Sequence, residues 1–303
     1  MDITSILYPV LSVGGLGLVF GAGLGFAGKV FAVEEDPRIG QVVECLPGAN
    51  CGGCGFPGCN GLASAIVAGT APVNGCPVGG AAAAAKIAVV MGVSAGETEK
   101  MVAHVNCKGT CTNAKSKYEY VGISDCTMAS QLASGGAKGC SYGCLGLGSC
   151  VKACAFGALS IVDGIAVVDE EKCVACGKCV KACPKHLVVL KPASKKTVVN
   201  CSSKDMGKTV IANCSVGCIG CKICEKNCKF DAIHVENNIA RIDYSKCKDC
   251  GLCAMKCPKN VIFNPRIEAM KAKQAAEAAA AKAEAEKEAA AEAPKTEEAP
   301  KAE

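Results

Sequence analysis

Cysteine is the residue whose number and spacing stand out, with 26 in a chain of 303 residues. Most of these cysteines lie in tight C-x2-C and C-x3-C groups. Cysteine-rich chains are either disulfide frameworks, which are usually short and secreted, or metal proteins that keep their thiolates reduced. Thiolates spaced so closely suit one shared inorganic centre better than disulfides between distant strands. The spacing therefore predicts metal–thiolate sites.

An internal repeat organises the cysteines between residues 140 and 257. Adding 74 to the number of each of eight cysteines gives the number of another cysteine. The first copy contains Cys140, Cys144, Cys150, Cys154, Cys173, Cys176, Cys179 and Cys183, and the second contains Cys214, Cys218, Cys224, Cys228, Cys247, Cys250, Cys253 and Cys257. Duplication of one module explains the match.

The second copy predicts two 4Fe–4S clusters. In bacterial two-cluster ferredoxins, a C-x2-C-x2-C-x3-C-P run gives three ligands to one cluster and the fourth to its neighbour. One predicted ligand set is Cys218, Cys221, Cys224 and Cys257, and the other is Cys228, Cys247, Cys250 and Cys253. The alternating segments 231–238 and 239–245, between the two runs, predict a short β-hairpin.

The first copy lacks one of these ligands, because Leu147 stands at the position of Cys221. Cys140 is the nearest replacement, so one predicted set is Cys140, Cys144, Cys150 and Cys183. The other set keeps the ferredoxin pattern and contains Cys154, Cys173, Cys176 and Cys179. An altered loop changes the hydrogen bonds to sulfur, which predicts a different reduction potential for the first of these clusters.

A separate cysteine group lies upstream, in PGANCGGCGFPGC. Its predicted ligands are Cys51, Cys54 and Cys59, with Cys76 as the fourth. The glycines of this segment allow tight turns that point backbone amides toward sulfur. Four thiolates suit Zn²⁺ equally well, so a structural zinc site is the alternative.

The cysteines left over are Cys45, Cys107, Cys111, Cys126, Cys201 and Cys214. We predict a sixth cluster on Cys107, Cys111 and Cys126, with either Cys201 or Cys214 as the fourth ligand. Cys126 and Cys201 also occupy similar places before their repeats, which is equally consistent with relics of duplication. We predict that Cys45 is a free thiol. The total is five or six 4Fe–4S clusters.

The N-terminus predicts a membrane anchor. No charged residue occurs over the 26 positions from Ile3 to Gly28, which exceeds the roughly 20 needed to span a bilayer. A cleaved signal peptide is the alternative, but no basic segment precedes the run. Lys29 and Arg38 after the run, against Asp2 before it, predict a cytoplasmic location for the rest of the chain. Glycines at every fourth position from 17 to 25 predict a face for a partner helix.

The whole chain predicts an α+β protein in six parts. These are a transmembrane anchor (1–31), a small 4Fe–4S module (32–80), a connector with the candidate sixth cluster (81–135), tandem ferredoxin-like two-cluster modules (136–195 and 196–265) and an Ala/Glu/Lys-rich tail (266–303). The tail is rich in helix-forming residues but has no apolar stripe, so we predict that it is helical or disordered.

Charge and motifs exclude other kinds of site. The net charge is only +5 and the basic residues are interleaved with cysteines, so nucleic-acid binding has no support. GGLGLVFGAG lies inside the apolar run, so no NAD or flavin site and no catalytic residue is predicted. Lysines crowd the repeats and suit an acidic partner, or simply offset cluster charge in a solvated surface. They are Lys172, Lys178, Lys181 and Lys185 in the first copy and Lys222, Lys226, Lys229, Lys246, Lys248, Lys256 and Lys259 in the second.

The order of these parts resembles that of a known family. An apolar N-terminal helix, LPGANCGGCGFPGC, VNCKGTC and two ferredoxin modules resemble the B subunit of the Rnf complex, in the longer form of anaerobes, over residues 1 to about 263. The resemblance implies a complex that oxidises soluble ferredoxin, reduces NAD⁺ and exports Na⁺ or H⁺. It also implies membrane partner subunits and a single-pass location in the inner (cytoplasmic) membrane.

Within such a complex, the resemblance implies a role in carrying electrons from ferredoxin through the clusters toward membrane partners. Hydride transfer would belong to another protein of the complex. The alternative is a membrane-tethered ferredoxin that serves a hydrogenase or another reductase without ion pumping.

Overall fold

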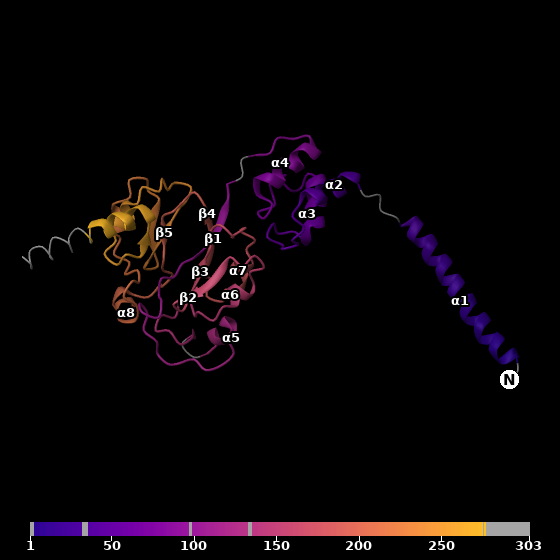
Figure 1. Ribbon diagram of the computed structural model, residues 1–303, viewed down its shortest axis with the longest axis horizontal. Coiled ribbons are helices and arrows are strands. Elements are labelled where there is room, and N and C mark those ends of the chain that lie inside the picture. The colour runs from indigo at the N-terminus through magenta and orange to yellow at the C-terminus, as the bar shows by residue number, and fades with distance from the viewer. Residues whose placement is uncertain (1–2, 32–35, 97–98, 133–134, 275, 277–303) are drawn as a thin grey trace, which may run out of the picture.

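The computed structural model describes residues 3–31, 36–96, 99–132, 135–274 and 276 (Figure 1). The helices are α1 (Ile3–Val30), α2 (Pro37–Cys45), α3 (Gly58–Val67), α4 (Gly80–Met91), α5 (Cys126–Ser130), α6 (Ser149–Lys152), α7 (Lys178–Ala182), α8 (Gly207–Asn213), α9 (Ile223–Lys226) and α10 (Leu252–Lys256). The strands are β1 (Met101–Val105), β2 (Leu159–Val162), β3 (Ile165–Val168), β4 (Val188–Pro192), β5 (Val198–Val199), β6 (Ile233–Glu236), β7 (Ile239–Ile242) and β8 (Ile262–Phe263). Helices and strands are thus mixed, as predicted.

Helix α1 has the length and composition of a membrane span. Its stretch Val10–Val30 has a mean hydropathy of 1.9 and none of it is buried. Within the described residues it is the single helix that passes this test. Exposed Leu, Val and Phe side chains along a helix are unfavourable in water, so the helix needs an apolar environment.

Helices α2, α3 and α4 pack around one small core. Its most buried side chains are Val42, Leu62, Ile66 and Ile87. Helix α2 begins cleanly because Asp36 accepts a hydrogen bond from the backbone N–H of Arg38 at 2.9 Å and Pro37 occupies the first turn. This core supports the glycine-rich loop between α2 and α3, which carries the upstream cysteines.

The two sequence repeats have the same order of elements. The first repeat runs α6, β2, β3, α7, β4, and the second runs α9, β6, β7, α10, β8. In each, the first two strands form an antiparallel hairpin, β2 with β3 and β6 with β7. The last strand pairs antiparallel with a strand from upstream, β4 with β1 and β8 with β5. We call residues 136–195 the first repeat and 196–265 the second repeat.

Two elements that pack against the repeats lie outside the predicted bounds of the repeats. Strand β1 lies in the segment predicted to be a connector, but it pairs with β4 and so completes the first repeat. Residues 266–274 of the predicted tail are helical, and Ile267 is buried against the second repeat. Residues 275 and 277–303 of that tail lie outside the described residues.

Candidate iron–sulfur sites

Each repeat presents its cysteines on loops of one shape. In each of the four loops that lead into α6, α7, α9 and α10, two residues with positive φ are separated by one residue with negative φ. These are Gly146 and Gly148, Ala175 and Gly177, Gly220 and Lys222, and Asp249 and Gly251. Such alternation turns successive backbone N–H groups toward the inside of the loop, where they favour an anionic group. The loop around Leu147 keeps this shape although it lacks a cysteine.

Three cavities are each lined by one of the predicted four-cysteine sets. Cys218, Cys221, Cys224 and Cys257 line the first, Cys228, Cys247, Cys250 and Cys253 the second, and Cys154, Cys173, Cys176 and Cys179 the third. Their empty volumes are about 380, 350 and 320 Å³. Equivalent amides also point at sulfur, because Ala158 N donates to Cys154 Sγ and Ala232 N to Cys228 Sγ, both at 3.4 Å.

The upstream cysteines lie together over the α2–α4 core. Burial raises the pKa of Cys76, as do the nearby thiols of Cys51 and Cys54. Gly79 N donates to Cys76 Sγ at 3.3 Å, and the side-chain oxygen of Asn50 accepts from Cys59 N at 2.8 Å. Cys45 packs against the same core.

A cysteine from outside the repeat lies near the loop that lacks one. Cys126, at the start of α5, lies with Cys144 and Cys183 in the electrostatic surroundings of Cys150. Asp125 explains this placement, because its carboxylate accepts from Thr127 N and Met128 N in α5 and from Ser149 Oγ in α6. Ser149 Oγ in turn accepts from Cys126 N at 2.7 Å.

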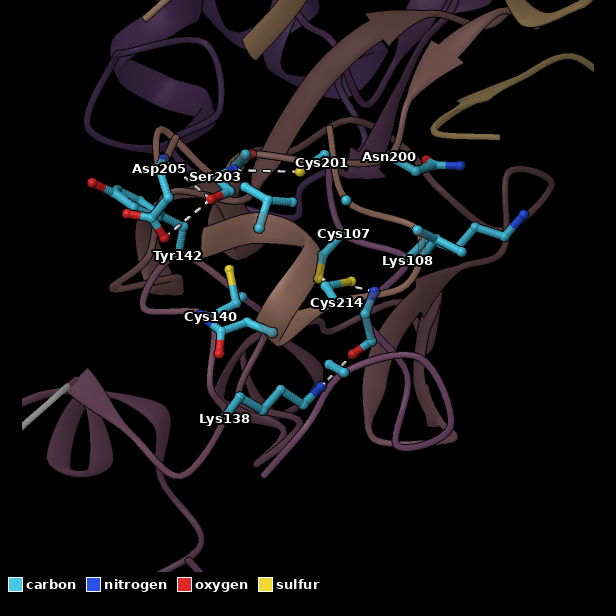
Figure 2. Close-up of a pocket in the computed structure, with 18 residues that line it drawn as sticks. Cys107, Lys108, Lys138, Cys140, Tyr142, Asn200, Cys201, Ser203, Asp205 and Cys214 are labelled. Carbon is cyan, nitrogen blue, oxygen red and sulfur yellow. Dashed lines mark hydrogen bonds between the residues drawn. The ribbon is translucent and has the colours of Figure 1, made fainter. Parts of the chain in front are cut away.

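The structure therefore groups the remaining cysteines differently from the sequence prediction. Cys140, predicted to complete the Cys144 set, lines a separate cavity with Cys107, Cys201 and Cys214 (Figure 2). Cys126, predicted for the sixth cluster, lies instead near Cys150. Cys111 is exposed, does not line this cavity, and donates its backbone N–H to Asp163 O at the β2–β3 turn. Spacing along the chain cannot reveal that α5 folds back onto α6.

Burial controls the protonation of the cysteines inside the repeats. It raises the pKa of Cys150 and Cys253 to about 12, and that of Cys179 and Cys224 to about 11, with neighbouring cysteines adding to the effect. Such thiols stay protonated at neutral pH unless a bound cation replaces the proton. Sets of four thiolates suit metal centres that prefer soft ligands, and iron–sulfur clusters are one class of such centres.

The upstream site and the first repeat are in contact. A Cβ built on Gly53 would lie 2.7 Å from Cys176 O, so only glycine allows this approach. Cys54 and Cys173 line one shared cavity between the two parts. The backbone of one candidate site therefore lies directly against a cysteine of the next.

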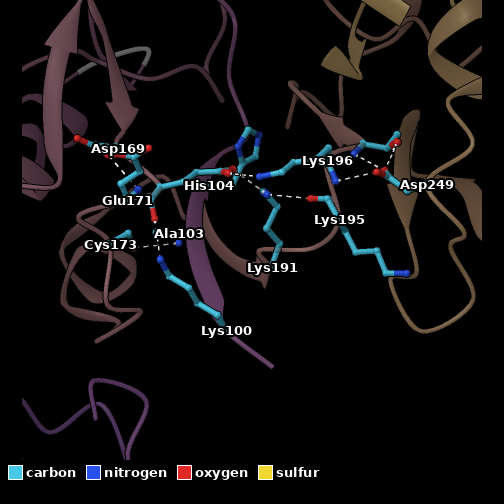
Figure 3. A network of polar contacts seen from close by, with 12 residues as sticks. Lys100, Ala103, His104, Asp169, Glu171, Cys173, Lys191, Lys195, Lys196 and Asp249 are labelled. Atoms are coloured by element: carbon cyan, nitrogen blue, oxygen red, sulfur yellow. Dashed lines mark hydrogen bonds and ion pairs between the residues drawn. The ribbon is translucent and has the colours of Figure 1, made fainter. Parts of the chain in front are cut away.

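A polar network joins the two repeats (Figure 3). The buried ammonium of Lys191 lies 2.9 Å from Glu170 Oε1, and Lys196 Nζ lies 2.7 Å from Glu170 Oε2. Burial alone would raise the pKa of Glu170, but hydrogen bonds from these two lysines outweigh it and lower the pKa. Asp249 of the second repeat accepts from Lys196 N and Thr197 N at 3.1 and 2.6 Å.

Comparisons with known proteins agree with the candidate sites. A family model described as "Putative Fe-S cluster" matches residues 46–78, which contain the four upstream cysteines. One described as "4Fe-4S binding domain" matches twice, at residues 166–187 and 240–263. Matches and geometry together define the class as an iron–sulfur electron-transfer protein.

Curated relatives narrow this class to one family. The chain is 52% identical to the B subunit of the Na⁺-translocating ferredoxin:NAD⁺ oxidoreductase complex of Acetobacterium woodii, over 86% of this chain and 78% of that protein. It is 47% identical to the B subunit of the ion-translocating oxidoreductase complex of Methanosarcina acetivorans (86% and 98% covered) and 45% identical to the proton-translocating counterpart of Clostridium ljungdahlii (82% and 88%). The chain belongs to the B subunits of ion-translocating ferredoxin:NAD⁺ oxidoreductase complexes, which confirms the resemblance seen in the sequence.

Proposed function

We propose that this chain accepts electrons from reduced soluble ferredoxin at its second repeat. The electrons pass through the first repeat and the upstream site toward membrane partner subunits, which use them to reduce NAD⁺ and to export Na⁺ or H⁺. A bound 4Fe–4S cluster supplies one-electron redox chemistry. The chain itself positions the clusters, shields them and presents a surface to the donor.

The observation that carries this proposal is the different exposure of equivalent cysteines in the two repeats. Cys176 of the first repeat is buried, and Gly53 of the upstream site lies against its backbone. Cys250, its equivalent in the second repeat, is exposed, as is Cys221. The first repeat uses this surface to contact the upstream site, whereas the second repeat leaves the equivalent surface exposed. An external electron donor can approach there.

The proposal includes five ligand sets, which the cysteine spacing and the positions of the cysteines in the structure support. The upstream set is Cys51, Cys54, Cys59 and Cys76, and the first repeat holds Cys126, Cys144, Cys150 and Cys183 as well as Cys154, Cys173, Cys176 and Cys179. The second repeat holds Cys218, Cys221, Cys224 and Cys257 as well as Cys228, Cys247, Cys250 and Cys253. Backbone amides that donate to sulfur stabilise the negative charge of each cluster.

Membrane attachment comes from α1. A single span at Val10–Val30, with Lys29 at its end and Arg38 after it, supports a location of both repeats on the cytoplasmic side. The names of the relatives differ in the translocated ion, so both Na⁺ and H⁺ stay candidates here.

Charge reversal on the second repeat tests where ferredoxin binds. Lys222, Lys226, Lys248 and Lys256 are all exposed. Changing these four to Glu should slow oxidation of reduced ferredoxin, most strongly at low salt, because exposed charges act on the association rate and salt screens them. Stopped-flow kinetics at several ionic strengths measure the effect, with a small uncharged reductant as the reference.

The first repeat supplies a control, with Glu at its exposed lysines Lys172 and Lys181. Ferredoxin kinetics should change little in this second variant. If instead only this variant slowed the reaction, electrons would enter at the first repeat and the proposed direction would be wrong.

A further inference from the structure

Four cysteines that the proposed function does not use surround one cavity between the two repeats (Figure 2). Cys107 and Cys140 come from the side of the first repeat, and Cys201 and Cys214 from the side of the second. Like each of the three cavities inside the repeats, this cavity has four cysteines in its lining.

The four cysteines are related as two equivalent pairs. Cys140 and Cys214 are 74 residues apart, like the other cysteines of the repeat. Cys107 and Cys201 each follow a strand that pairs with the last strand of its repeat, β1 with β4 and β5 with β8. Each also ends the same tripeptide, Val-Asn-Cys. The duplication that formed the repeats therefore formed both halves of this site.

Hydrogen bonds to sulfur follow the same symmetry. Cys107 Sγ accepts from Gly109 N and Cys144 N, both at 3.4 Å. Cys201 Sγ accepts from Ser203 N at 3.5 Å and from Cys218 N at 3.4 Å. Cys144 and Cys218 belong to the ligand sets of the two repeats. One peptide group therefore links each neighbouring set to a sulfur of this cavity.

Two segments hold the halves together. Residues 113–117 pair on one side with Cys214, through an antiparallel bridge at Ala114, and on the other with the segment before Cys140, through a bridge between Ser116 and Lys138. Lys115 sits in the middle of this segment, and its N–H donates to Asn213 O at 2.9 Å while its carbonyl accepts from Gly139 N at 2.7 Å.

The second connection joins the Val-Asn-Cys turns of the two halves. Lys108 N donates to Asn200 O at 3.1 Å, and His104 Nε2 lies 2.9 Å from Asn200 Oδ1. Burial lowers the pKa of His104, so the ring is neutral at pH 7. Because an amide oxygen only accepts, Nε2 carries the proton of this contact. The cavity is therefore fixed by backbone and buried side chains, which suits a rigid ligand.

We propose that Cys107, Cys140, Cys201 and Cys214 hold a further 4Fe–4S cluster that relays electrons between the two repeats. One electron leaves a reduced cluster of the second repeat, which becomes oxidised, and reduces this centre. The centre then returns to its oxidised state by giving the electron to the first repeat. The ligand set stands on the geometry alone, and the direction of flow rests on the proposed function.

A double variant that takes one ligand from each side tests the proposal in the full-length protein. Cys107→Ser with Cys214→Ser should lower the iron and acid-labile sulfide of the anaerobically reconstituted chain by about four atoms each. The matched control is Cys111→Ser, which removes a nearby exposed cysteine and should leave both contents unchanged. Low-temperature EPR of the dithionite-reduced protein should lose the signal of one centre only in the double variant. Retention of the other signals shows that the remaining sites are folded.

Kinetics test the relay with the same proteins. Ferredoxin should still reduce the second repeat of the double variant quickly, while reduction of the remaining centres should slow at least tenfold. Unchanged iron, or zinc in place of iron at this site, would overturn the cluster assignment. Loss of iron without slower reduction would overturn the relay. If ferredoxin failed to reduce even the wild-type chain, the proposed function would fail, although the iron loss would still establish the ligand set.

Discussion

The two repeats share one backbone plan, but their surroundings differ. Each has a hairpin, two short helices that follow cysteine loops, and a last strand paired with a strand from upstream. Around the first repeat, the upstream site covers Cys176 and α5 supplies Cys126. The second repeat has its own complete cysteine sets and leaves Cys221 and Cys250 exposed. The first repeat is thus partly covered by its neighbours, whereas the second repeat has the exposed surface that the proposed function assigns to a soluble donor.

Leu147 marks the sharpest difference between the copies. It occupies the place of Cys221, yet Gly146 and Gly148 on either side keep the positive φ angles of the second-repeat loop. The loop can therefore present a cysteine at this position without refolding. In the proposed ligand set of the first repeat, Cys126 replaces the missing cysteine, and hydrogen bonds of Ser149 to Asp125 and Cys126 hold α5 against α6.

The largest expected effect comes from removing and restoring this ligand. Cys126→Ser should destabilise one centre and lower the iron content by up to about four atoms per chain, because a 4Fe–4S cluster of this type uses four cysteine thiolates. Adding Leu147→Cys to that variant should restore the iron, since the loop already has the required shape. Iron analysis and EPR of the two variants check this. Failure of Leu147→Cys to rescue a folded Cys126→Ser variant would show that the two loops are not equivalent.

A smaller effect is expected at the contact between the upstream site and the first repeat. Gly53→Ala places a methyl group within 2.7 Å of Cys176 O, so the two parts must move apart. Electron transfer weakens steeply with distance, so reduction of the upstream site by ferredoxin should slow several-fold at unchanged iron content. Gly40→Ala is the matched control, because its Cβ meets nothing within 4 Å in the same part of the chain. Equal rates in the two variants would remove this contact from the electron path.

The smallest effect concerns stability at the junction. Glu170→Gln leaves the Lys191 ammonium, only 1% exposed, without its anionic partner. Breaking a buried ion pair costs about 3–5 kcal/mol, and we expect the lower end because the Glu170 side chain is 39% exposed. Lys191→Met should cost less, since Glu170 keeps Lys196.

Anaerobic thermal unfolding at one fixed scan rate compares the two junction variants. Tyr244 and Pro265 stand at the equivalent positions of the second repeat, so this pair is a feature of the first copy alone. Equal destabilisation by the two substitutions would mean that the pair does not protect a buried charge.

The sequence was informative wherever ligands lie close along the chain. The runs at Cys218–Cys228 and Cys247–Cys257 gave ligand sets that the structure places around cavities. The same holds for Cys154 with Cys173, Cys176 and Cys179. In these loops the local spacing itself fixes which sulfurs face the same side.

Ligands that come from folding between segments could not be predicted in this way. The prediction of Cys140 for the Cys144 set followed proximity in sequence. The structure places Cys140 at another cavity, and the Asp125–Ser149 hydrogen bond holds Cys126 near Cys150. The repeated Val-Asn-Cys, at Cys107 and Cys201, was a signal in the sequence that the 74-residue offset hides, because these copies are 94 residues apart. A search for short repeats at other offsets would have paired them.

Iron and acid-labile sulfide analysis of the full-length chain, purified and reconstituted without oxygen, tests the central claim most directly. Six four-cysteine sites, including the one between the repeats, predict about 24 iron and 24 sulfide per chain. About 20 of each would mean that the cluster proposed between the two repeats is absent. Fewer than about 16 of each, in a chain that retains its fold, would contradict the continuous row of 4Fe–4S sites from the second repeat to the upstream site.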